Sequence, residues 1–365
     1  MTSYARMPAY KPVNIQPKRI LVITLRYLGD TLLITPLLSS LKQAYPDAEI
    51  DVLLPASNVG MLEGNPDVAK LIPLVGKPGL SSFVRLLLSV FKRYDVAIST
   101  QAGDRPILCA ILAGKFSMGF VSGNGAKNLW KHMLLDRSLV SVVRNSHSVL
   151  ENQRFCELLN ISPCYRLSPP RPLQANQILM PDRKYAVLHV MPQWRYKQWY
   201  EQGWKELGYY LHQKGYQLIL TGSGGEIEQE VLRRLETMLP SSTLNMAGQL
   251  SLAELTLLIE KAKIFIGPDT GTTHLAAATG VLTIALFGPT DPRSWGPWPL
   301  GYSENRPPFV SVGTQSVNNV CVIQGQVGQT CVPCQLEGCE RHRESRSACL
   351  DGLSSNTVIK VLENL

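Results

Sequence analysis

Short apolar runs alternate with segments of helical periodicity along the first half of the chain. The β-rich runs are RILVITL, AEIDVLL and YDVAIST, at residues 19–25, 48–54 and 94–100. Between them, TPLLSSLKQAYP and SSFVRLLLSVFKR, at residues 35–46 and 81–93, have the spacing of amphipathic helices. Strands that alternate with helices are typical of a parallel sheet wound with helices. We therefore predict a doubly wound α/β domain here.

A second series of the same kind begins near Tyr185. Its predicted strands are YAVLHV, YQLILTG, IFIGP and LTIALFG, and helices are expected over WKELGYYLHQKG and from about Glu226 and Ser251. The chain has 365 residues, more than one hydrophobic core usually organises, so two domains are expected.

Residues 161–181 lie between the two series, and they are dense in proline and lack periodicity, as an interdomain linker is. We therefore predict an N-terminal Rossmann-like domain over residues 1–172 and a C-terminal one over residues 173–365. The second domain is expected to include a cysteine-rich tail and a final helix capped by Ser355 or Asn356.

Composition and charge narrow the class of partner. No apolar run reaches the roughly 18 residues that span a bilayer, and the first residues lack the pattern of a signal peptide, so a cytoplasmic protein is expected. The net charge of +8 indicates an acidic partner or an anionic surface. No basic run interleaved with aromatic residues supports nucleic acid. An anionic membrane surface, a phosphorylated acceptor and a nucleotide all fit this charge.

The stretch RYLGDTLLITPLLSSL places Asp30 between a buried strand and a helical run. Asp is a favoured N-cap residue, and taken alone this propensity favours a cap. The alternative is a reactive carboxylate at the C-terminal edge of a parallel strand, where open α/β sheets bind ligands. Pro36 interrupts any helix that continues through it, and Thr35-Pro36 resembles a new helix start. We therefore expect a kinked element that keeps Asp30 near the cleft.

The stretch IFIGPDTGTTHLAAATG indicates an anion site. A buried strand ends in the polar turn that holds Asp269, Thr270 and Gly271, and a helix of small residues runs from His274 to its C-cap at Gly280. The free N–H groups of such a helix suit a diphosphate. Asp269 would position the loop or a sugar hydroxyl, since a carboxylate repels phosphate. The alternative is an ordinary capped turn in which His274 is a satisfied helix residue. A second turn, FGPTDP, on the same side favours a ligand site.

Two further loops follow predicted strands. Lys197, between aromatic residues in MPQWRYKQWYEQGW, could neutralise a diphosphate leaving group or be a solvated surface lysine, and the position of its loop at the same cleft favours the first. Glu226 starts a helix after TGSGG, which is not a dinucleotide fingerprint because Ile227 stands where the third glycine would be. Glu226 could accept from a ribose or base, but the preference of first helical turns for acids favours a cap. Carboxylates are not clustered as a Mg²⁺-bridged nucleotide usually needs, so no metal is expected at this site.

Five of the eight cysteines lie near the C-terminus. Four of them have the spacing C-x2-C-x4-C-x9-C: Cys331, Cys334, Cys339 and Cys349. Two interpretations remain, a structural metal site or reduced cysteines that pack in loops. The spacing fits no standard zinc template, which favours the second, and a disulfide is not expected in a reducing cytosol.

Two stretches, ILVITLRYLGDTLLITPLLSSLKQAYPDAEIDVLLP and GPDTGTTHLAAATGVLTIALFGPTDPRSW, together resemble the ADP-heptose lipopolysaccharide heptosyltransferases of glycosyltransferase family 9, most of all the heptosyltransferase III branch. The similarity spans residues from about Lys18 to Trp298. It implies a GT-B fold, two Rossmann-like domains facing a cleft. It also implies inverting, metal-independent transfer of heptose from ADP-L-glycero-D-manno-heptose to the lipopolysaccharide inner core, without a cofactor. The implied partners are this donor and a lipid A–core oligosaccharide, with peripheral association at the anionic cytoplasmic face of the inner membrane.

The resemblance also implies roles for individual residues. Asp30 would be the general base, Lys197 would neutralise the diphosphate, and Glu226 would bind the nucleoside. The phosphate loop would comprise Asp269, Thr270, Gly271 and His274. Heptosyltransferase I has Thr-Thr shortly before the lysine, whereas this chain has Pro192 and Gln193, so hydroxyl contacts to phosphate from this loop are not expected.

Two other functions remain open from the sequence. The chain could be a GT-B transferase that uses another nucleotide sugar for a cell-surface glycan, or a non-catalytic nucleotide- or glycan-binding protein. Basic residues of the N-terminal domain, namely Arg105, Lys127 and Lys131, could meet acidic groups of an acceptor or could be solvated.

Overall fold

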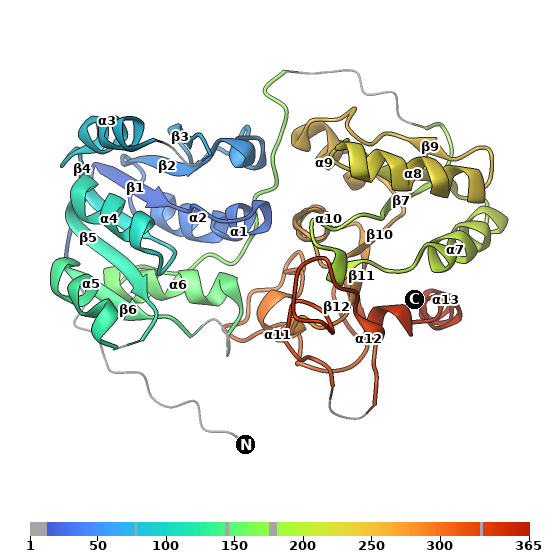
Figure 1. The fold of residues 1–365 in the computed structure, drawn as a ribbon. Coiled ribbons are helices and arrows are strands. Elements are labelled where there is room, and N and C mark those ends of the chain that lie inside the picture. Colours follow the sequence, from blue (N-terminus) through green and yellow to red (C-terminus); the bar gives the residue numbers. More distant parts are fainter. Residues whose placement is uncertain (1–12, 77–78, 124, 143–145, 175–180, 329–330) are drawn as a thin grey trace.

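The computed structural model describes residues 13–365 except 77–78, 124, 143–145, 175–180 and 329–330. The N-terminal segment, in which no signal peptide is expected, lies mostly outside these residues, as does part of the predicted linker. The described residues form two α/β domains, each built on its own sheet (Figure 1). The predicted class, two doubly wound domains facing a cleft, is confirmed. The boundary between residues 172 and 173 stays a prediction.

The first sheet has six strands in the order β3-β2-β1-β4-β5-β6, and every neighbouring pair is parallel. The strands are β1 Arg19–Ile23, β2 Glu49–Pro55, β3 Lys70–Leu74, β4 Tyr94–Ser99, β5 Gly114–Val121 and β6 Arg137–Val140. The helical segments of this domain are α1 Leu28–Leu33, α2 Thr35–Ala44, η1 Ala56–Leu62, α3 Leu80–Val90, α4 Asp104–Ala113, η2 Ala126–Asn128, α5 Leu129–Leu134 and α6 Ser148–Leu159.

Alternate residues of β1 divide the core of this domain into two layers. Ile20 and Val22 pack with residues of α2 and α6, whereas Leu21 and Ile23 pack with residues of α3 and α4 on the opposite face. A strand that is buried on both faces reads as a continuous apolar run, which is why RILVITL shows no polar alternation. Helices therefore cover both faces of the sheet and leave its C-terminal edge free for a site.

The second sheet has seven strands in the order β12-β13-β11-β10-β7-β8-β9, parallel except for the edge strand β12. The strands are β7 Tyr185–His189, β8 Gln217–Thr221, β9 Leu244–Asn245, β10 Ile264–Pro268, β11 Leu282–Phe287, β12 Gln315–Val317 and β13 Val320–Gln324. The helical segments are η3 Arg195–Lys197, α7 Glu201–Gln213, α8 Glu226–Met238, α9 Leu252–Lys261, α10 Gly271–Thr279, α11 Pro292–Trp295, α12 Ala348–Asp351 and α13 Ser355–Glu363. No helix of the described residues is long and apolar enough to cross a membrane.

Two predicted helix caps are wrong in detail. Asp30 is not an N-cap: α1 is capped at Tyr27, and Asp30, three residues later, accepts a hydrogen bond from the Tyr27 N–H (3.3 Å). The final helix is capped by Ser354, whose side chain accepts from the Thr357 N–H, rather than by either of the two residues that follow Ser354. The expected break before Pro36 is confirmed, because α1 ends at Leu33 and Pro36 lies in the first turn of α2.

Polar contacts between described residues join the domains. The buried His147 ring accepts from the Val149 N–H through Nδ1, so its Nε2–H donates to the Gly296 carbonyl of the second domain (2.8 Å). Arg171 forms a bidentate ion pair with Glu260. These contacts help to fix the orientation in which the C-terminal edges of the two sheets face each other.

Candidate functional site

The two domains touch backbone to backbone where α1 meets α10. A Cβ atom on Gly271 would lie 3.0 Å from the Gly29 nitrogen, and one on Gly29 would lie 3.4 Å from the Gly271 Cα. Glycine, which has no Cβ, permits this approach without displacement. The contact brings the start of α1, which carries Asp30, against the N-terminus of α10. It therefore brings the two motifs of the sequence together.

Lys197 and Asp269 form an ion pair at the C-terminal ends of neighbouring strands. Lys197 follows β7 in the short helix η3, Asp269 follows β10, and the Nζ to Oδ2 distance is 2.6 Å. Burial alone would lower the pKa of Lys197, but the charges of Asp269, Tyr196 and Asp30 and the hydrogen bond to Asp269 together outweigh burial and raise that pKa above its ordinary value. The lysine is thus a fixed, fully charged cation. It is not the solvated surface lysine of the alternative interpretation, and Asp269 positions it.

The N-terminus of α10 presents backbone and ring nitrogens beside this lysine. Thr270 caps the helix by accepting from the Thr273 N–H (3.3 Å). His274 is 5% exposed, and among the described residues its Nδ1 has no hydrogen-bond partner. Burial lowers the pKa of His274 to about 4, so the ring is neutral at pH 7. A buried ring nitrogen without a partner costs stability unless a ligand or water supplies one. The capped turn of the alternative interpretation is thus present, with Thr270 as its cap, but no protein group among the described residues satisfies the Nδ1 atom of His274.

Asp30 lies across the interdomain contact from this cation. Burial raises the pKa of Asp30 above 3.8, and the charges of Arg26 and Lys197 and the Tyr27 N–H counteract the increase only in part. A carboxylate with a raised pKa is a stronger base than an ordinary one. The half-buried position is suited to proton removal from a bound hydroxyl.

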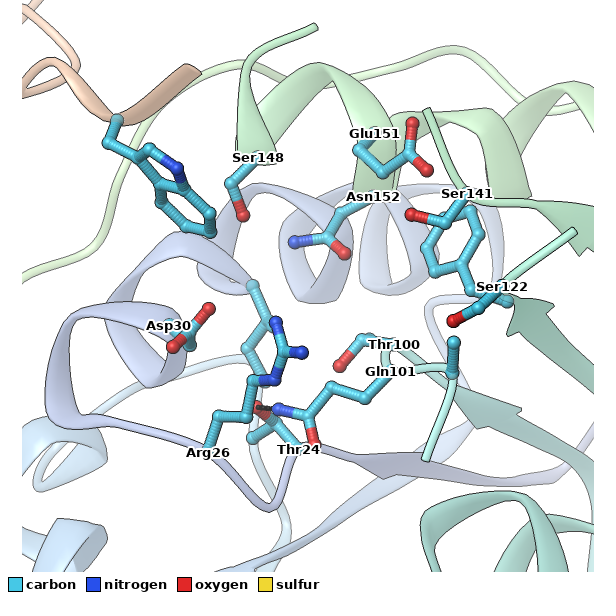
Figure 2. Close-up of a pocket in the computed structure, with 14 residues that line it drawn as sticks. Thr24, Arg26, Asp30, Thr100, Gln101, Ser122, Ser141, Ser148, Glu151 and Asn152 are labelled. Atoms are coloured by element: carbon cyan, nitrogen blue, oxygen red, sulfur yellow. Dashed lines mark hydrogen bonds between the residues drawn. The ribbon is translucent and has the colours of Figure 1, made fainter. Parts of the chain in front are cut away.

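A cavity of about 130 Å³ opens next to Asp30 and is walled mainly by hydroxyl and amide side chains (Figure 2). These groups include Thr100 and Gln101 after β4, Ser122 after β5 and Asn152 on α6, and Trp295 of the second domain also lines it. Hydroxyl and amide groups are the partners that a polyhydroxylated ligand needs. The cavity therefore provides a second binding region on the N-terminal side of the cleft.

Arg26 places a guanidinium group in this cavity beside the Asp30 carboxylate, a feature that the sequence interpretation missed. Glu151 also lines the cavity, but it accepts from Arg154 (3.1 Å) and from the Val142 N–H, so its charge is compensated. In the described part of the chain the Arg26 guanidinium forms no ion pair, and it points into the cavity near Asp30 (Figure 2). The sequence feature that could have identified Arg26 is its position just after the strand and four residues before Asp30.

Glu226 is the first residue of α8 and is exposed. The loop before it is instead held by Glu228, which accepts from the Ser223 N–H (2.7 Å) and the Gly224 N–H (3.2 Å). The sequence favoured Glu226 as the capping residue, but Glu228 accepts these hydrogen bonds instead. The expected contact of Glu226 with a nucleoside stays a prediction.

The cysteine-rich tail packs against the loop that carries Lys197. Ser347 donates to the Tyr196 carbonyl (2.6 Å), and the Arg343 guanidinium lies 4.2 Å from the centroid of the Trp194 ring. Trp194 also contacts the first domain, because its ring meets the Tyr27 ring edge-on (centroids 6.2 Å apart). The tail thus supports both the lysine loop and the start of α1, which the sequence did not predict.

The cysteines of this tail differ in exposure. Cys331 and Cys339 are exposed, Cys334 is partly buried, and Cys349 is buried, which raises its pKa to about 12. Within the described ranges, no group of three or more His, Cys, Asp or Glu residues is arranged to hold a metal ion.

Comparisons with known proteins place this geometry in context. The profile of glycosyltransferase family 9 (heptosyltransferase) matches residues 85–306. The chain is 30% identical to lipopolysaccharide heptosyltransferase 3 of Escherichia coli K12 over 75% of this chain and 83% of that protein. Among solved structures, it resembles the family 9 glycosyltransferase of Veillonella parvula (TM-score 0.74, 16% identity, 98% of this chain and 99% of that one). It also resembles E. coli heptosyltransferase WaaC with ADP (TM-score 0.70, 20% identity, 95% and 99% of the two chains).

Proposed function

This chain belongs to glycosyltransferase family 9, and from that membership we propose that it transfers a heptose from ADP-L-glycero-D-manno-heptose to the inner core of lipopolysaccharide. The observation that carries the proposal is the position of Asp30 across the Gly29–Gly271 contact from the Lys197–Asp269 pair. A base and a fixed cation on opposite sides of a cleft suit a displacement in which a hydroxyl attacks while an anion leaves. Relatives named for heptose transfer to lipopolysaccharide, and a solved relative with ADP-2-deoxy-2-fluoro heptose, support this donor and acceptor.

The donor half of the reaction is assigned to the second domain. Lys197 and the N-terminus of α10 at Thr270 and Gly271 would stabilise the negative charge that grows on the departing diphosphate. The free Nδ1 of His274 would form a hydrogen bond with the donor. Glu226 would bind the nucleoside. In this scheme the chain's own cation and helix dipole neutralise the leaving group, so the reaction is metal-independent.

The acceptor half is assigned to the first domain. Asp30 would take the proton of an acceptor hydroxyl as its oxygen attacks the anomeric carbon from the side opposite to ADP, which inverts the configuration in one step. Arg26 and the amide and hydroxyl groups of the cavity would orient the lipid A–core oligosaccharide. An enzyme with this acceptor would work at the cytoplasmic face of the inner membrane, with which the positive net charge is compatible.

The test is ADP release by the purified chain, measured with ADP-heptose and a heptose-deficient core acceptor. We expect activity with ADP-heptose and a loss of roughly 10²–10⁴-fold in Asp30→Ala, the range that a general base contributes. Binding of ADP-, UDP- and GDP-sugars separates this function from that of another nucleotide-sugar transferase. If Asp30→Asn and Lys197→Ala left the cellular core structure unchanged, a non-catalytic binding protein would replace the proposal.

A further inference from the structure

Helices α3 and α5 carry large apolar side chains that face away from the core. On α3 and at its end, Val84, Leu88 and Phe91 are 43%, 67% and 54% exposed. On α5, Leu129, Met133 and Leu134 are 58%, 74% and 56% exposed. The inward residues of α3, by contrast, pack against the first sheet. Both helices are thus amphipathic and have an outer apolar side without a covering element among the described residues.

The two helices belong to one continuous surface. Helix α4 lies between them in the chain and in space, because Arg105 of α4 stacks over Phe83 of α3 (5.5 Å) and Trp130 of α5 packs against the cluster that contains Ile107 of α4. In Figure 1 the three helices occupy the side of the N-terminal domain that faces away from the second domain. We call the six apolar residues named above, together with Arg85, Arg93 and Lys127, the outer face.

Positive charge is concentrated around these helices. Residues 80–137 contain eight Lys or Arg and three Asp, a net charge of +5 in a chain whose total is +8. The acidic residues are already engaged: Asp95 pairs with Lys115, Asp104 with Lys131, and Asp136 accepts from Ser117. Lys131, which from the sequence could have met an acidic group of the acceptor, is instead buried and forms the ion pair with Asp104. In the described part of the chain, Arg85, Arg93 and Lys127 are exposed and form no ion pair.

We propose that the outer face docks on an anionic lipid bilayer, with the apolar side chains of α3 and α5 in the headgroup region and the free cations on the acidic headgroups. Amphipathic helices that combine exposed apolar residues with cations lie in the membrane interface in this way, and their binding depends on anionic lipid. The exposed cations beside these apolar side chains match the acidic headgroups of such a bilayer. Charge complementarity therefore selects the lipid surface.

Docking by this face would also orient the site. The loops that precede α4 and α5 supply Gln101 and Ser122 to the cavity beside Asp30. Helices α4 and α5 thus connect the docking side of the domain, which is turned away from the second domain, to the cavity that we assign to the acceptor. This step rests on the proposed function, whereas the docking itself rests only on the exposed residues and their charge.

The experiment measures sedimentation of the full chain with vesicles of phosphatidylglycerol and phosphatidylcholine, or of phosphatidylcholine alone, at low and high salt. We expect binding only with phosphatidylglycerol and its loss at high salt. The triple variant Arg85→Glu/Arg93→Glu/Lys127→Glu should partition at least about 100-fold more weakly. A matched control, Lys214→Glu/Lys263→Glu/Lys360→Glu, changes the net charge equally at exposed lysines of the second domain and should bind as the unaltered chain does.

A second pair of variants tests the apolar contribution. Leu88→Ser/Met133→Ser should weaken binding, whereas Leu173→Ser/Val310→Ser, at residues that are 78% and 65% exposed elsewhere, should not. Thermal unfolding of each variant verifies that it folds. Equal binding by outer-face and control variants would overturn the proposal, as would a chain that forms a dimer through this face and ignores vesicles.

Activity separates this inference from the proposed function. The apolar variant Leu88→Ser/Met133→Ser should retain ADP release with a delipidated acceptor and lose it with the same acceptor in vesicles. A chain that binds vesicles through the outer face but transfers heptose to no acceptor would refute the proposed function and leave the docking surface standing.

Discussion

The ammonium group of Lys197 lies 2.6 Å from a carboxylate oxygen of Asp269, although 72 residues separate the two in the chain. Each residue follows a strand of the second sheet, and the two strands are neighbours. The pair holds a charged lysine at the place where the proposed reaction releases an anion.

Replacing Lys197 by alanine should lower kcat by roughly 10²–10³-fold, the cost of removing one preorganised group that stabilises charge in a transition state. Asp269→Asn should have a smaller effect, since the lysine remains but loses its fixed position. Steady-state kinetics measure both. Lys263→Ala, at an exposed lysine just before β10, is the control and should leave kcat unchanged. A normal kcat in Lys197→Ala would contradict the role of this cation.

The pH dependence of the rate should reflect the raised pKa of Asp30. The base acts only when ionised, so kcat/KM should fall as the pH is lowered through an apparent pKa that lies above the ordinary value of 3.8. Arg26 lowers this pKa, so Arg26→Ala should move the acidic limb to higher pH. A limb that stays in place in this variant would mean that another group controls the profile.

The same raised pKa predicts that Asp30→Asn stabilises the protein near neutral pH. A carboxyl group whose pKa is higher in the folded than in the unfolded state favours folding below its unfolded pKa, and this contribution is lost as the pH rises through the folded pKa. At pH 7 the ionised Asp30 therefore opposes folding, and Asn removes that cost. Thermal unfolding should show a higher midpoint for Asp30→Asn at pH 7 and a smaller difference at pH 4.

Arg26 should contribute to acceptor binding and not to donor binding. Arg26→Ala removes the guanidinium group of the cavity, and we expect the KM for the acceptor to rise about 10- to 100-fold, as for loss of a charge-assisted hydrogen bond. The KM for the donor should not change. Lys at this position should restore part of the affinity, because the charge returns without the planar guanidinium. Equal increases in both KM values would point to a general loss of structure.

The tail should support catalysis through the Lys197 loop. Arg343→Ala removes the stacking on Trp194, which is worth about 0.5–1 kcal/mol at an exposed site, so kcat should fall about 2- to 5-fold. Arg341→Ala, at an exposed tail residue, is the control. Hydrogen exchange of residues 194–197 should increase only in the first variant, and unchanged exchange would exclude this support.

Substitution of Glu226 should affect donor binding, whereas substitution of Glu228 should affect the stability of the fold. Glu228→Ala leaves the loop N–H groups of residues 223 and 224 without an acceptor and should lower stability by about 1 kcal/mol. Glu226→Ala should leave stability unchanged and raise the KM for the donor. The reverse result would make Glu226 a structural residue only.

The sequence predicts the two sheets more completely than it predicts the site. The alternation of buried strands and amphipathic helices is local and repeated, so two doubly wound domains follow from it. The glycine-aspartate turn and the DTGTTH turn each read as caps when taken singly, because capping and anion binding use the same residue types. Only their contact at Gly29 and Gly271 brings the two turns into one site.

Contacts between distant segments account for the remaining differences. Nothing local to Asp269 reveals that it pairs with Lys197, and no periodicity relates Arg343 to Trp194. Capping propensity taken alone favours Asp30 as the N-cap of α1, whereas the chain places Tyr27 at that position and uses the carboxylate one turn later.

The backbone contact between Gly29 and Gly271 also has a consequence for how this protein can change over time. A methyl group at Gly271 would come within 3.0 Å of the Gly29 nitrogen, so the helix that carries the proposed base would have to give way by a few tenths of an ångström, whereas a methyl group at Gly29 would fit at ordinary contact distance. The atom nearest to the Gly271 methyl group belongs to the backbone, so no side-chain rotation could make room for it. The missing Cβ of Gly271 therefore helps to set how near the proposed proton acceptor of one domain comes to the proposed anion site of the other.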